Sequence, residues 1–116
     1  MMVMSVRHQV RGYVEKLFEG LKEKLHGGEY LVFNVYAKEG NILEMVDVRV
    51  DFSDGEAIKK FLDRTTRETL EQEVKGLRLI AMVLEKDGDY VFSSQEEISE
   101  ELKEEIKEMI EQLKEE

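Results

Sequence analysis

The sequence predicts one α+β domain over residues 1–116, in which helices pack on a four-stranded antiparallel sheet. Two pairs of apolar runs are separated by short turns that contain glycine, Glu39-Gly40-Asn41 and Asp87-Gly88, and such pairs are typical of β-hairpins. A stretch with helical periodicity precedes each hairpin, and a third such stretch ends the chain. The expected order of elements is therefore α-β-β-α-β-β-α, and 116 residues suffice for one such domain.

The first half of the chain predicts a helix followed by a hairpin. Apolar residues recur at steps of three and four over residues 5–26, and Gly27 and Gly28 then suit a helix end. Strands are expected over residues 30–38 and 42–52. The second of these strands alternates cleanly between valines on one face and Met45 with charged residues on the other, whereas the first is apolar on both faces.

The second half of the chain repeats this order. Ser53 and Glu56 form a capping box, a serine three residues before a glutamate, and predict a helix that runs to about residue 75. A strand that is apolar on both faces is expected over residues 77–85, with a return strand over residues 90–92. Ser94 and Glu97 form a second capping box, which predicts a long last helix over residues 94–116.

The last predicted helix carries most of the negative charge of the protein. Residues 94–116 contain ten Glu and three Lys, a net charge of −7, and the whole chain has a net charge of −10. An acidic surface repels nucleic acid and anionic membranes, and it favours a basic protein partner. A basic protein is therefore an expected partner, and nucleic acid and membranes are not.

The same helix has an apolar stripe that admits two interpretations. Leu102, Ile106, Met109 and Leu113 recur at steps of four, three and four, which is heptad spacing. The helix can dock on the sheet of its own chain, with its Glu and Lys side chains in solvent. Alternatively, it packs through these four residues against a second copy or a partner.

Strands that are apolar on both faces predict an interface. Tyr30, Val32, Tyr36 and Met45 are expected on the face of the sheet that the helices leave open. An uncovered apolar patch of that size is unusual for a monomer, so it predicts a symmetric homodimer. The alternative is that helices cover both faces of the sheet.

Carboxylates on the strands offer an alternative function. Asp47 and Asp51, together with Glu44 or Glu85, are the residues that a small metal-dependent hydrolase or nuclease would use. A row of surface ion pairs explains the same residues. The two histidines of the chain are about 27 Å apart along the first helix and cannot share a metal. No catalytic residue, metal ligand or cofactor-binding residue is therefore predicted.

Basic residues form a weak strip on the first two predicted helices. Five basic residues stand against three acidic residues on the first helix, and four more basic residues lie on the second. The strip is expected to pair with the acidic helix, either within one chain or between two chains. Its members are Arg7, Arg11, Lys16, Lys22, Lys24, Lys59, Lys60, Arg64 and Arg67.

Composition narrows the classes of protein further. The chain has no Cys, which excludes disulfides and thiolate metal sites. Charged residues interrupt the N-terminal segment at once, and no apolar stretch approaches the roughly 18 residues of a membrane span, so a cytoplasmic protein is expected. Charged residues make up 38% of the chain, which is typical of proteins from hyperthermophiles.

The order of elements, with a strand–Asp-Gly–strand unit at residues 79–92 and acidic residues after it, is similar to that of YezG-like immunity proteins. Those are small acidic proteins that neutralise toxins by binding them, and their extended aromatic C-terminal segment is replaced here by the Glu-rich helix. The order also resembles the roadblock-type adaptor fold, which has a further strand before its last helix. These resemblances imply a role in protein binding. The sequence thus predicts a non-enzymatic, adaptor-like or inhibitor-like protein that forms a homodimer.

Overall fold

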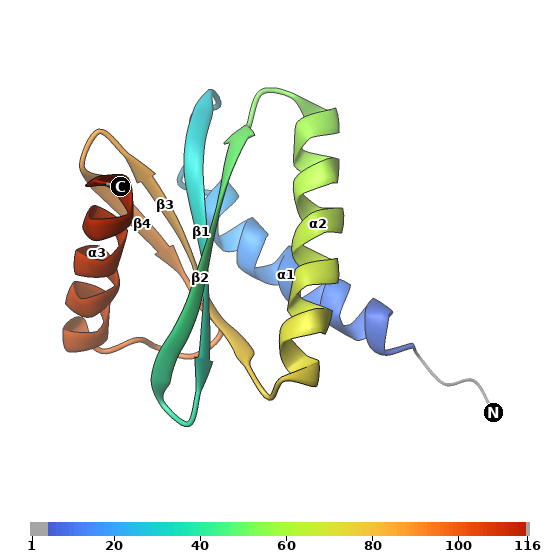
Figure 1. The fold of residues 1–116 in the computed structure, drawn as a ribbon. Helices are drawn as coiled ribbons and strands as arrows, with labels where there is room; N and C mark the ends of the chain where they lie inside the picture. Colours follow the sequence, from blue (N-terminus) through green and yellow to red (C-terminus); the bar gives the residue numbers. More distant parts are fainter. Residues whose placement is uncertain (1–4, 116) are drawn as a thin grey trace.

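Three helices and four strands make up the part of the chain that the computed structural model describes, residues 5–115 (Figure 1). They follow the order α-β-β-α-β-β-α, which confirms the predicted fold, and α1 ends a few residues earlier than expected. The elements are α1 Val6–Lys22, β1 Glu29–Lys38, β2 Asn41–Asp51, α2 Gly55–Val74, β3 Arg78–Lys86, β4 Asp89–Ser93 and α3 Glu100–Glu115.

The four strands form one antiparallel sheet with the order β2-β1-β3-β4. Glu39 and Gly40 join β1 to β2, Asp87 and Gly88 join β3 to β4, and all four residues have positive φ angles. Positive φ at both central positions is the mark of a type I′ turn, whose twist matches that of the strands it joins. Both predicted hairpins are therefore confirmed, and α2 carries the chain from one hairpin to the other.

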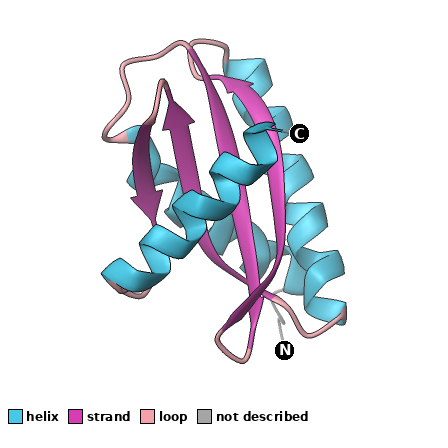
Figure 2. Cartoon of the chain, turned by 60° about the vertical axis from the view of Figure 1, so that its left-hand side comes forward, coloured by secondary structure: helices cyan, strands magenta, loops and turns pink. Residues whose placement is uncertain are grey.

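Helices cover both faces of the sheet, with α1 and α2 on one face and α3 on the other (Figures 1 and 2). The expectation of a face left open by the helices is therefore wrong. The apolar stripe of α3 docks on the sheet of its own chain, where Ile106 and Ile110 are fully buried. Burying this stripe removes apolar surface from water without any partner, which is the usual fate of an amphipathic helix.

Each face of the sheet has its own apolar core. The core beneath α1 and α2 contains Val10, Val14, Leu17, Phe18, Leu21, Val32, Tyr36, Val50, Phe61, Leu77, Leu79, Met82 and Leu84. The core beneath α3 contains Phe33, Val35, Ala81, Val83, Ile98, Ile106 and Ile110. The two apolar faces of β1 and β3 thus belong to two separate cores, which explains why neither strand alternates between apolar and polar residues.

The start of α2 differs from its predicted capping box. The N-cap is Asp54, whose side chain accepts hydrogen bonds from the backbone N–H groups of Glu56 and Ala57. Ser53 Oγ instead accepts a hydrogen bond from Gly28 N at 2.9 Å. The N-cap is thus one residue later than predicted, because the Ser53 hydroxyl is engaged by a segment distant in the chain. Asp is as favourable an N-cap residue as Ser.

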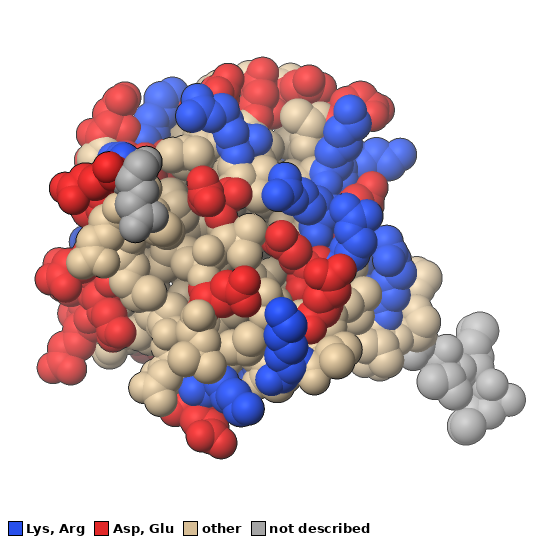
Figure 3. Space-filling model, in the orientation of Figure 1, with Lys and Arg blue, Asp and Glu red and all other residues tan. Residues whose placement is uncertain are grey.

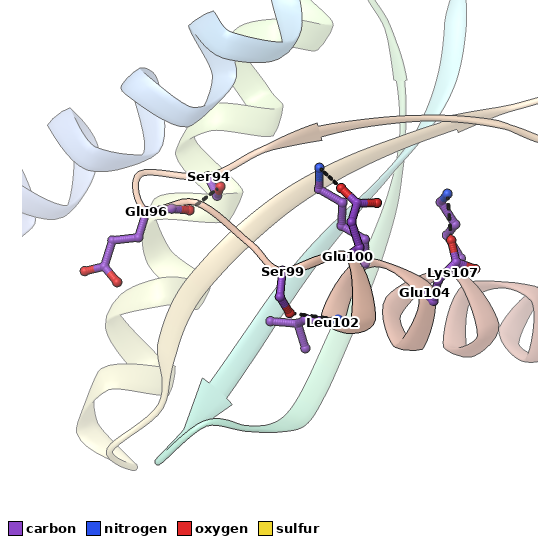
Figure 4. Close-up of polar contacts among 8 residues, drawn as sticks. Ser94, Glu96, Ser99, Glu100, Leu102, Glu104 and Lys107 are labelled. Atoms are coloured by element: carbon purple, nitrogen blue, oxygen red, sulfur yellow. Dashed lines mark hydrogen bonds and ion pairs between the residues drawn. The ribbon is translucent and has the colours of Figure 1, made fainter.

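The start of α3 also differs from the prediction (Figure 4). Ser99 Oγ accepts a hydrogen bond from Leu102 N at 3.1 Å, and the helix begins at Glu100. Ser94 Oγ donates to a backbone carbonyl two residues further on, so it caps no helix. The segment between these serines leads from β4 to the α3 side of the sheet and buries Ile98. The helix therefore starts only after this crossing is complete.

Candidate protein interface

The four strand residues predicted to form an interface do not share one face. Val32 and Tyr36 are 0% exposed and lie in the core beneath α1 and α2, and Tyr30 packs at the border of that core. Met45 pairs with Val35 and packs on the opposite side, against the core beneath α3. Directly paired residues point to the same face of a sheet, so Met45 belongs with the row of Val35. Val32 and Tyr36 are therefore not available to a partner.

The four residues of α3 that were predicted to contact a partner differ in how far they are buried. Ile106 is fully buried beneath α3, and Leu102 packs against the same core. Met109 is partly buried, and Leu113 is 38% exposed. Met109 and Leu113 thus keep surface that a partner can contact, whereas Ile106 serves the fold.

β2 is an edge strand of 11 residues. Phe52 N donates a hydrogen bond to Gly28 O at 2.8 Å, and the register runs without a shift from there to the pair Tyr36 and Glu44. Residues of an antiparallel pair alternate in the direction of their hydrogen bonds, so the even-numbered residues from Glu44 to the end of β2 bond to β1. The odd-numbered residues of this part of β2, from Met45 to Asp51, direct their N–H and C=O groups outward, where no strand of residues 5–115 lies.

The side chains of this edge are partly apolar and partly charged. Leu43 is 60% exposed and occupies a bulge, where β2 has one residue more than β1. Asp47 and Arg49 are exposed on the α3 side, and Arg49 forms a surface ion pair with Glu29 at 3.0 Å. The edge therefore offers backbone hydrogen bonds, an exposed leucine and charges of both signs.

The acidic and basic residues gather on different layers of the molecule. In the view of Figure 3 acidic side chains crowd over α3 at the left and basic side chains over α2 at the right, and further charged side chains are scattered over the surface between them. The sheet separates α3 from the basic strip, so the predicted pairing of the two within one chain is wrong. Arg11 of that strip binds Asp63 and Glu15 instead, and its hydrogen bond lowers the pKa of Asp63.

No helix within residues 5–115 has the length and apolar character needed to cross a membrane.

A row of polar side chains lies buried between α2 and the sheet. Asn34 Nδ2 donates to Thr65 Oγ1 at 3.3 Å, and the hydroxyl groups of Tyr36 and Thr69 are 3.0 Å apart. Burial raises the pKa of Tyr36 to about 12, so this hydroxyl keeps its proton near neutral pH. Helical periodicity predicts the inward direction of Thr65 and Thr69, but Asn34 is missed because it interrupts an apolar strand. Such specific bonds favour one position of α2 on the sheet.

Glu68 lies on the same helix in an unfavourable environment. Burial raises its pKa, Arg64 opposes this effect, and the neighbouring carboxylates Glu71 and Glu44 raise the pKa further. Its Oε2 atom is buried and has no hydrogen-bond partner among residues 5–115. A carboxyl group whose pKa is raised in the folded state stabilises the fold at low pH, and this stability is lost as the pH rises through the folded-state pKa.

We therefore expect Glu68→Gln to raise the free energy of unfolding at pH 7, by less than about 1 kcal/mol because the group is partly solvated. Urea unfolding at pH 7 and at pH 4 measures the effect, which should shrink at the lower pH because wild-type Glu68 is then protonated. Glu71→Gln, at an exposed position of the same helix, is the control and should give a smaller gain. A loss of stability in Glu68→Gln at both pH values would contradict the assignment.

The carboxylates of the alternative hydrolase are not brought together. Asp47 and Asp51 share the α3 side of β2, whereas Glu44 faces α2 and accepts a hydrogen bond from it at 2.6 Å. Glu85 is bound by Lys114 Nζ at 2.8 Å. Among the residues that the structure describes, no group of three or more His, Asp or Glu side chains is placed to hold a metal ion.

A groove of about 510 Å³ lies beside the start of α3. Apolar side chains and charged side chains both line it, and the walls come from the β1–β2 turn, the start of β3 and residues 96–102. Its lining residues are Ala37, Glu39, Gly40, Arg78, Ile80, Glu96, Glu97, Ile98, Ser99 and Leu102. Sequence reasoning missed this groove because its walls are far apart in the chain.

These features define a small α+β protein of three layers with a long open sheet edge. The chain belongs to the same family as an uncharacterized protein of Aquifex aeolicus (strain VF5). The two are 41% identical over 101 residues, which cover 81% of this chain and 84% of that relative. No family model matches the sequence, and no solved structure matches the chain.

Proposed function

We propose that this protein acts by binding other proteins, as an adaptor-like or inhibitor-like module that forms a homodimer, and not as an enzyme. The observation that carries the proposal is the open edge of β2, with its outward N–H and C=O groups and the exposed Leu43. An unpaired strand edge is a template for pairing with another chain, and strand addition is a common mode of recognition. Met109 and Leu113 of α3 are partly exposed, and they add apolar surface on the face of the sheet that also carries Met45.

Charge supports a basic protein as a second partner. The net charge of −10 is concentrated towards the C-terminus, and seven Glu lie on α3 against three Lys. Ion pairs within α3 and to β3 use all three of these lysines, so an excess of carboxylates remains at the surface. Such an excess speeds the approach of a basic protein and disfavours acidic ones.

A thermal-shift and turnover screen with Mg²⁺, Mn²⁺ and Zn²⁺ tests the proposal against the metal-dependent hydrolase. We expect no turnover of nucleic acids or of model esters and phosphoesters, and the same response to each metal in the wild type and in Asp47→Asn. The physical reason is that, within residues 5–115, Asp47 belongs to no group of three or more His, Asp or Glu side chains placed to hold a metal ion. Turnover that requires both a metal ion and Asp47 would overturn the proposal.

The substitution Asp47→Pro tests the use of the β2 edge directly. It removes one outward N–H group and leaves the hydrogen bonds to β1 in place, and proline is tolerated on such edges. The candidate partners are the protein itself and the products of neighbouring genes. We expect the substitution to weaken binding while the circular dichroism spectrum stays unchanged.

A further inference from the structure

We infer that the partner on the β2 edge is a second copy of the chain, joined antiparallel about a two-fold axis at Val48. The sheets of the two copies then form one continuous sheet, and both copies use the same surface, as a two-fold interface requires. This inference rests on the proposed function, because it names the partner and the register at the same edge.

The backbone of β2 limits the registers that are open to such a pair. Between Glu44 and Asp51 the outward groups belong to odd-numbered residues, so an odd-numbered residue of one copy must pair with an odd-numbered residue of the other. A two-fold axis at any single residue from Glu44 to Asp51 meets this condition within this segment. An axis at an even-numbered residue places that residue opposite its own copy in a pair without hydrogen bonds.

The charged side chains select among these registers. With the axis at Val48, Asp47 of each copy lies opposite Arg49 of the other, so two pairs of opposite charges form. With the axis at Asp47 or at Arg49, that residue faces its own copy, and like charges directly opposite each other are destabilising. With the axis at Val46, Asp47 faces Met45, which gives neither attraction nor repulsion. With the axis at Val50, Arg49 lies opposite Asp51, but the paired segment of β2 then spans only residues 49–51. The register about Val48 joins opposite charges within a longer paired segment, residues 45–51.

Two further features of the edge bear on this register. Arg49 now makes an exposed ion pair with Glu29, which contributes little in water and leaves the guanidinium free to contact a second carboxylate. Lys60 and Arg64 of α2 line a shallow pocket with Val48, and the two-fold axis brings them near their own copies. Their long side chains can direct the charges to solvent, so this approach weakens the dimer but does not prevent it.

Cysteine cross-linking tests the register, because the chain contains no Cys. Val48 faces itself in a pair without hydrogen bonds, in which Cα atoms are about 4.5 Å apart, within the range that a disulfide spans. We expect Val48→Cys to form a covalent dimer under mild oxidation, at twice the chain mass of 13.6 kDa. Val46→Cys is the matched control, since Val46 is also partly buried on the same face and would lie opposite Val50. A covalent dimer of Val46→Cys without one of Val48→Cys would overturn the register.

A charge exchange gives an independent test by light scattering at micromolar concentration. Asp47→Arg and Arg49→Asp each place like charges opposite each other twice, so we expect each to weaken the dimer by about tenfold or more. The double variant Asp47→Arg/Arg49→Asp restores opposite charges in this register alone and should restore the dimer. A wild-type monomer, or a double variant no better than the single ones, would overturn the inference.

The two proposals fail in different ways. If the wild type is monomeric but binds the product of a neighbouring gene through the β2 edge, the second copy is the wrong partner and the protein-binding function stands. In that case the charges of β2 protect a single chain against self-association, as charges on edge strands commonly do. Metal-dependent turnover that needs Asp47 would instead overturn the protein-binding function.

Discussion

Replacing Ile106 with alanine is expected to lower the free energy of unfolding by about 3 kcal/mol. Ile106 is fully buried between α3 and the sheet, in a core that includes Phe33, Val35 and Val83. The substitution removes apolar contacts with these residues and leaves a cavity that the rigid sheet cannot close. Urea unfolding of the wild type and the variant at one protein concentration measures the difference.

Leu113→Ala is the matched control for this substitution. Leu113 lies on the same helix and belongs to the same heptad pattern, but it is 38% exposed. We expect its replacement to change the free energy of unfolding by less than about 1 kcal/mol. Equal effects of the two substitutions, or an effect of Ile106→Ala on association alone, would mean that α3 docks on a partner and not on its own sheet.

Replacing Gly20 with alanine is expected to destabilise the protein by about 1–3 kcal/mol, although alanine favours helices. A Cβ atom at Gly20 would lie inside the van der Waals distance of Ser93 Oγ and 3.3 Å from Ser93 Cβ. Ser93 cannot simply turn away, because its hydroxyl is buried and donates to the carbonyl of Leu17 at 2.6 Å. The added methyl group therefore either breaks this hydrogen bond or moves α1 away from β4.

Gly12 provides the opposite case in the same helix. No atom lies within 4 Å of a Cβ built at Gly12, so Gly12→Ala should stabilise the protein by about 0.5–1 kcal/mol. Thermal unfolding of the two variants measures the difference in sign. In a Ser93→Ala background, Gly20→Ala should cost less, because the closest atom is gone. Stabilisation by both glycine substitutions in the wild-type background would contradict the packing of α1 against β4.

Much of the fold could be predicted from local sequence patterns. The Asp87-Gly88 pair marks a type I′ turn because both positions need positive φ. The first hairpin was also predicted, but its turn is Glu39-Gly40 alone, and Asn41 already belongs to β2. The alternation along β2 correctly groups its valines on one face and Met45 on the other. Helix starts were less accurate, since Ser53 and Ser94 bind other backbone groups in the folded chain.

The candidate interface could be predicted only in part. Leu113 and Met109 keep some exposure, whereas Val32, Tyr36 and Ile106 are buried within one chain. Apolar residues suited to an interface have the same chemistry as those suited to a core, so the sequence does not separate the two. The open edge of β2 escaped prediction because it depends on strand order, and strand order follows from how the two hairpins meet.

The sequence by itself determined the order of the seven elements, the two hairpin turns and the apolar stripe of the last helix. These features depend on residues that are close in the chain, where backbone preference and side-chain period act directly. Only the tertiary structure decided which apolar row of β1 faces which helices, and that β2 is an open edge. Both rows of β1 are largely apolar, so the local pattern does not assign them to a side. In the structure the row with Asn34 and Tyr36 meets Thr65 and Thr69 of α2, and the other row meets α3.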